Sequence, residues 1–112
     1  TMLFAHEMTH IWQWQNREVT GFHPLRAVQE QRDDDPYLFD LDPPKPFLDY
    51  GYEQQAALVE EFLCCRTLDP DGGRTAQLYA LLEPHFPGLP RQSTVEKVNL
   101  PWPEAETKGI CA

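Results

Sequence analysis

The sequence predicts a mainly α-helical fold with long proline-rich irregular segments. Residues 1–18 and 51–67 carry apolar side chains at helical spacing, and neither range contains proline. Ten of the eleven prolines follow residue 35, where they prevent regular structure over long stretches. A chain of 112 residues holds one domain at most. We therefore expect a helical core over residues 1–86, with a proline-rich tail over 87–112 packed on it or extending from it.

The first helix, residues 1–18, has apolar side chains on most of its circumference. They recur on one side at helical spacing: Phe4, Met8 and Ile11. His6 and His10 lie on a neighbouring side, four residues apart. The polar remainder is small: Thr9, Gln13 and Asn16. A helix of this kind is normally buried among other elements, and Gly21 is a plausible stop signal beyond it.

The other elements follow in order. Residues 22–50 are predicted to be largely irregular, with a short helix over 24–31, and to wrap the site. The second strong helix covers 51–67, the sequence DPDGG at 69–73 is a turn, and a third helix covers 74–83. One short strand is expected near Val95–Val98 in the tail.

Charge and cysteine content narrow the class of protein. The formal net charge of −9 argues against nucleic-acid binding, which needs clustered Lys and Arg. No apolar run approaches the ~20 residues that span a bilayer, so no membrane partner is expected.

Cys64 and Cys65 are adjacent on a predicted helix, where their side chains diverge, and Cys111 lies in the tail. We expect no disulfide framework, which favours a cytoplasmic location while leaving export open.

The residues His6-Glu7-Met8-Thr9-His10 form an HExxH pattern on the first helix. Imidazoles four residues apart stack on one face of a helix and can both reach one zinc ion. A Glu directly after the first His is offset from the metal and can act as the general base of a metallopeptidase. The sequence therefore predicts a Zn²⁺ site with His6 and His10 as ligands and Glu7 as the catalytic base.

A catalytic zinc generally has three protein ligands and a water. Glu53 is the preferred third ligand, because it begins the second helix and the small residues Ala56 and Ala57 allow a close helix approach. Glu60 lies two turns further along the same face and is the competing ligand. His23 and His85 are also weighed as ligands, but both sit beside prolines and are better explained as loop histidines.

Two strings strengthen this choice: LFAHEMTHIWQWQ at 3–15 and YGYEQQA at 50–56. Over residues 1 to about 65 the chain resembles a family of bacterial zincins, the Vgr-related or DUF4157-like peptidase domains, associated with type VI secretion. The resemblance implies a gluzincin arrangement of His6, His10 and Glu53. Such sites often have an acidic residue where this chain has Ala57. They also have a β-sheet before the HExxH helix, which is expected to be missing here and supplied by an N-terminal segment or second chain.

Two functions of different classes follow. The first is a zinc-dependent hydrolase, a metallo-endopeptidase of peptide or protein substrates, with Tyr52, Tyr50 or His23 as oxyanion donor and Tyr52 preferred. The alternative is a non-catalytic zincin-like domain, in which structural zinc supports assembly or interaction with secretion-apparatus proteins. Retention of Glu7 favours the enzyme, because a structural site needs no base. Hydrolysis of a non-peptide amide, such as a cell-wall crosslink, would use the same residues.

Overall fold

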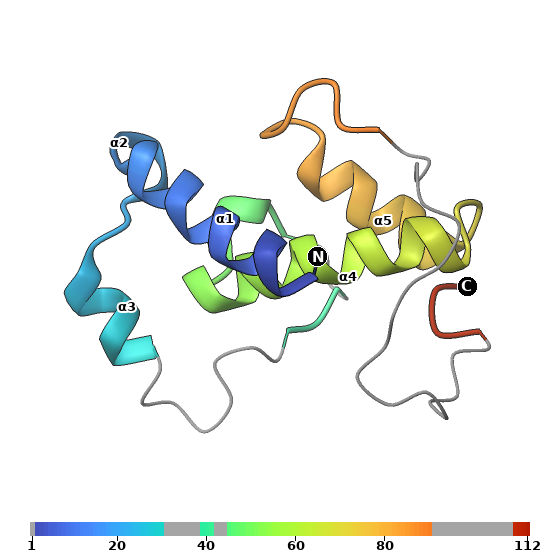
Figure 1. Cartoon of the computed structure of the whole chain (residues 1–112), viewed down its shortest axis with the longest axis horizontal. Coiled ribbons are helices and arrows are strands. Elements are labelled where there is room, and N and C mark those ends of the chain that lie inside the picture. The colour runs from blue at the N-terminus through green and yellow to red at the C-terminus, as the bar shows by residue number, and fades with distance from the viewer. Residues whose placement is uncertain (1, 31–38, 42–44, 91–108) are drawn as a thin grey trace. The chain divides into compact units, whose positions relative to one another are not determined.

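The computed structural model describes residues 2–30, 39–41, 45–90 and 109–112, and every regular element within these ranges is a helix (Figure 1). The prediction of a mainly α-helical fold is confirmed. None of the described helices is both long and apolar enough to cross a membrane. The chain divides into two compact units, Thr1–Glu60 and Glu61–Ala112. The expected boundary at residue 86 stays a prediction, and the strand near Val95–Val98 lies outside the described residues.

Among its described residues, the first unit holds four helices and the start of a fifth. They are α1 (Met2–Gln15), α2 (Arg17–Thr20), α3 (Pro24–Glu30), the 3-10 helix η1 (Phe47–Asp49) and the first turns of α4 (Tyr52–Leu68). Asn16 separates α1 from α2, so the helix predicted over 1–18 is interrupted at one residue. Gly21 ends α2 with a φ of 70°, in the left-handed region that glycine adopts at low cost. The predicted stop and the predicted short helix after it are both confirmed.

The side of α1 that faces the interior of this unit is polar. From Phe4 onward, the buried side chains of this helix are His6, Thr9 and Gln13. The apolar stripe of Phe4, Met8 and Ile11 is 68%, 44% and 47% exposed. The expectation that α1 is buried nearly all round was therefore wrong. The physical reason is that hydrogen-bonding side chains, rather than apolar ones, join α1 to the start of α4.

A carboxylate from α3 caps the N-terminus of α4. Oε1 of Glu30 accepts hydrogen bonds from the backbone N–H groups of Tyr52 at 2.7 Å and Glu53 at 3.4 Å. These N–H groups have no partner inside the helix, and the positive end of the helix dipole favours a carboxylate there. Gly51 makes room for this cap, because a Cβ at residue 51 would lie 2.9 Å from Oε1 of Glu30. The cap fixes the first turn of α4, which carries Glu53.

In the second unit, the rest of α4 meets α5 (Gly73–Leu82) through apolar side chains such as Phe62 and Tyr79, whose ring centroids are 6.0 Å apart. Its fully buried side chains include Phe62, Leu78 and Leu82. A disulfide joins Cys65 to Cys111 across 46 residues, with a Cα–Cα distance of 5.4 Å. The expectation of three free thiols was wrong for two of them, and only Cys64 is free. The side chains of Cys64 and Cys65 point in different directions from the helix, as predicted. Only Cys65 therefore faces Cys111 and forms the disulfide.

Candidate metal centre

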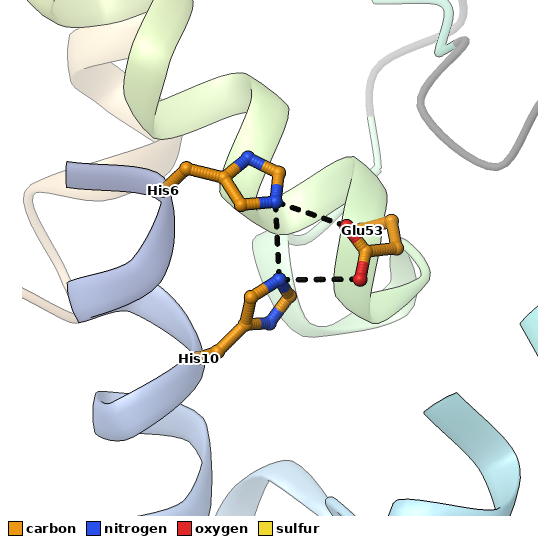
Figure 2. A group of neighbouring side chains, drawn as sticks. All are labelled: His6, His10 and Glu53. Atoms are coloured by element: carbon orange, nitrogen blue, oxygen red, sulfur yellow. Dashed lines mark hydrogen bonds and ion pairs between the residues drawn. The ribbon is translucent and has the colours of Figure 1, made fainter. Parts of the chain in front are cut away.

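The imidazoles of His6 and His10 meet the carboxylate of Glu53 in the interior of the first unit (Figure 2). Nε2 of His6 lies 3.0 Å from Oε2 of Glu53, and Nε2 of His10 lies 3.2 Å from Oε1. The two Nε2 atoms are 3.1 Å apart. Ligand atoms bound tetrahedrally at about 2.0–2.1 Å from zinc are separated by about 3.3–3.4 Å. The donor set and its spacing therefore fit a zinc ion held by these three residues.

Each of the three side chains is positioned by its helix. His6 and His10 lie on successive turns of α1, so both rings project from the same side. Glu53 lies in the first turn of α4, which Glu30 caps. His6 and Glu53 are buried and His10 is half-buried. Burial of a carboxylate beside two imidazoles is costly unless charges or hydrogen bonds satisfy them, and a divalent cation would do so.

Glu60 contacts His6 from the side of its ring that faces away from Glu53. Its Oε1 is hydrogen-bonded to Nδ1 of His6, the ring nitrogen that does not face Glu53. The sequence analysis weighed Glu60 as a competing ligand. In the structure it contacts His6 but is not one of the three residues whose ligand atoms converge. In the family that the chain resembles, an acidic side chain often stands at the position of Ala57 and supports a histidine. Here Glu60, one turn later on α4, supplies a carboxylate to His6 instead.

Glu7 follows His6 on α1, and its side chain is exposed. It is not one of the three residues whose ligand atoms converge. Its role stays a prediction.

The candidate oxyanion donors are placed less favourably. The hydroxyl of Tyr52 donates to the backbone oxygen of Gly21 at 2.5 Å, so an oxyanion role requires this bond to break and stays a prediction. The hydroxyl of Tyr50 donates to the backbone oxygen of Asp40, and burial raises the pKa of Tyr50, with the Asp40 charge adding to it. His23 is exposed, and its Nδ1 accepts a hydrogen bond from the backbone N–H of Leu25.

The sequence analysis missed several residues around this site, among them Gln13 and Glu30. Gln13 was assigned to the polar remainder of the first helix, but it is fully buried and binds His10. Its position three residues after His10 is the one local signal that could have identified it. Glu30 was not considered, and nothing in the sequence indicates that α3 reaches the start of α4. His85 lies in the second unit and is not part of the described metal-ligand group.

The chain is similar to part of a large secretion protein. It is 40% identical over 65 residues to the type VI secretion system spike protein VgrG2b of Pseudomonas aeruginosa. The match covers 54% of this chain but 6% of the relative, so the chain spans a small part of that protein's length. No family model matches the sequence, and no solved structure matches the chain. The Vgr-related part of the resemblance seen in the sequence is thus supported by a measured similarity.

Proposed function

We propose that this chain is a zinc-dependent hydrolase of the gluzincin type, acting as a metallo-endopeptidase. The observation that carries the proposal is the convergence of His6, His10 and Glu53, with interatomic distances of 3.0–3.2 Å. The two Nε2 atoms and the two carboxylate oxygens are all of the kind that ligate zinc, and two of the three residues are buried. An HExxH pattern on a helix supplies both the ligands and an adjacent carboxylate, which a purely structural site does not need.

The proposed roles follow from position. His6, His10 and Glu53 hold the metal, which when bound supplies Lewis-acid polarisation of a carbonyl and lowers the pKa of a water molecule to about 7. The Glu7 carboxylate accepts a proton from the attacking water as the water oxygen bonds to the carbonyl carbon. It then delivers that proton to the leaving amine nitrogen as the C–N bond breaks. Its exposure leaves it accessible to a substrate.

The similarity to a type VI spike protein supports an association of this activity with a secretion apparatus. We propose that the domain belongs to a spike-associated protein and meets its substrate through the secretion apparatus. The net charge of −9 favours basic peptide segments as substrates over acidic ones.

A second candidate is a structural zinc site without catalysis. The observation that favours it is that the three ligands come from two helices of one unit, so a bound ion would join α1 directly to α4. This candidate shares the ligands with the first and differs in the role of Glu7.

The test compares the zinc-loaded protein with its Glu7→Gln variant, and with Glu18→Gln as a matched control on the exposed surface of α2. Hydrolysis of an unfolded protein and of a fluorogenic peptide library is measured beside zinc content. The enzyme proposal predicts unchanged zinc content in both variants and a loss of about 10²–10⁴-fold in turnover for Glu7→Gln alone. Undiminished turnover in Glu7→Gln would contradict it. Zinc uptake without turnover in the wild type would favour the structural candidate.

A further inference from the structure

We infer that a second tier of hydrogen bonds, made by Gln13 with Gln55 and by Glu60, fixes the ring orientation and tautomer of the two histidines before metal binds. Gln13, Gln55 and Glu60 are thus positioning residues of the proposed zinc site. The inference rests on the proposed site but concerns residues outside its ligands. The two histidines are held by different chemistry, since an amide supports His10 and a carboxylate supports His6.

The support of His10 is a relay of two buried amides. Both Gln13 and Gln55 are 0% exposed. Oε1 of Gln13 lies 2.8 Å from Nδ1 of His10. Nε2 of Gln13 donates to the backbone oxygen of Tyr52 at 3.0 Å and to Oε1 of Gln55 at 2.9 Å. Nε2 of Gln55 in turn donates to the backbone oxygen of Tyr50 at 2.9 Å.

The relay has one consistent direction. A backbone carbonyl can only accept, so the amide nitrogen of each glutamine must face its carbonyl partner. The Oε1 atom of Gln13 is then left facing Nδ1 of His10, and an oxygen there can only accept. Nδ1 of His10 must therefore carry a proton. In a neutral imidazole this leaves Nε2 as a bare lone pair, directed at the group formed with His6 and Glu53.

Glu60 imposes the same state on His6. It lies seven residues after Glu53 on α4, which places it on the same side of the helix two turns later. Its carboxylate accepts from Nδ1 of His6, so Nε2 of His6 is also left to face Glu53. The Glu60 side chain is 32% exposed, whereas Gln13 and Gln55 are fully buried. The support of His6 is therefore charged and near solvent, and that of His10 is neutral and rigidly enclosed.

The consequence is a site that is set for a cation. When both rings are neutral, the two Nε2 lone pairs and the Glu53 carboxylate are acceptors within hydrogen-bonding distance of one another. Such a group suits a bound cation. Partners that orient a metal-ligating histidine typically account for 10–100-fold in metal affinity.

The experiment measures zinc affinity of the whole chain by competition with a chromophoric chelator. Gln13→Met and Glu60→Met remove the two supports at similar side-chain length. The matched controls are Gln15→Met, exposed on α1, and Glu61→Gln, a half-exposed carboxylate on α4. We expect each test variant to bind zinc about 10–100-fold more weakly and the controls to match the wild type. Glu60→Gln should recover part of the affinity lost in Glu60→Met, because its amide oxygen still accepts from Nδ1.

A second readout separates positioning from general loosening. In the zinc-loaded protein, ¹⁵N-resolved NMR should show a slowly exchanging Nδ1–H proton on both His6 and His10. Gln13→Met should speed the exchange of the His10 proton alone, and Glu60→Met that of the His6 proton alone. A merely structural effect would change both rings together. Because Glu60 is partly exposed, its variant should fold even if Gln13→Met does not.

The two failures are distinguishable. If the wild type takes up no zinc, the proposed function falls and this inference falls with it. If the wild type binds zinc and both test variants match its affinity and ring-proton exchange, only the inference is overturned.

Discussion

Both units bury apolar side chains, but they differ in what else stabilises them. The first, Thr1–Glu60, joins α1 to the start of α4 through buried polar side chains: His6, Gln13, Glu53 and Gln55. The second, Glu61–Ala112, relies on apolar side chains and on the Cys65–Cys111 disulfide. A buried polar network stabilises a fold only when every member is satisfied, whereas an apolar core and a disulfide need no ligand. We therefore expect metal to affect mainly the first unit and redox state mainly the second.

Removal of metal should have the largest effect, and in the first unit. At a free zinc concentration 1,000 times the dissociation constant, binding adds about 4 kcal/mol to the free energy of unfolding. We expect a chelator to speed hydrogen exchange at the amides of α1 far more than at those of α5. Exchange measured by mass spectrometry with and without chelator checks this. Equal acceleration in both helices would break the comparison between the units.

Loss of the disulfide should also lower stability, but mainly in the second unit. The Cys111→Ser variant opens a loop of 46 residues, and we expect it to lower the free energy of unfolding by about 2–4 kcal/mol. Denaturant titration measures the loss in the free energy of unfolding. Hydrogen exchange should become faster at the amides of α5 rather than at those of α1. Cys64→Ser is the control, because Cys64 is free. A cost in Cys64→Ser as large as that in Cys111→Ser would contradict the pairing.

The ion pair between Arg74 and Glu61 should contribute little. Its atoms are 2.8 Å apart, but the two side chains are 31% and 33% exposed. Pairs of this kind are screened by water and salt, so we expect Arg74→Ala to cost about 0.2–1 kcal/mol, and less at high salt. Denaturant titrations at two salt concentrations measure it. A larger cost that salt does not reduce would mean that polar contacts also dominate the second unit.

The free thiol should show the smallest effect. Burial raises the pKa of Cys64 above 9.0, and the charge of Glu61 raises it further. The thiolate is the reactive form, so at about pH 8 a raised pKa means a smaller reactive fraction than in the unfolded chain. Alkylation with iodoacetamide should be slower in the folded protein, and slightly faster in Glu61→Gln than in the wild type. Equal rates in the folded and unfolded protein would contradict the assigned environment.

The sequence predicted those features that depend on local spacing. The helices over 1–18, 51–67 and 74–83 were recognisable from apolar periodicity, and the structure has helices in all three ranges. His6 and His10 could be paired because a helix fixes residues four apart, and Glu53 could be favoured from its place at the start of a helix.

The features that escaped prediction depend on contacts distant in sequence. Gln13 on α1 donates hydrogen bonds to Tyr52 and Gln55 on α4, so the polar side of α1 faces α4 and the apolar stripe is left exposed. Cys65 could not be matched to Cys111, because 46 residues separate them and no pattern marks the pair. The contact between Glu60 and His6 likewise requires the packing of two helices to be known.

Elemental analysis of zinc in the purified protein, beside its Glu53→Ala and Glu61→Ala variants, tests the central claim most directly. The two glutamates lie on the same helix, and only Glu53 lies within the proposed ligand group. The account predicts about one zinc per chain in the wild type and in Glu61→Ala, and a clear loss in Glu53→Ala. No zinc in the wild type after reconstitution, or full retention in Glu53→Ala, would contradict it.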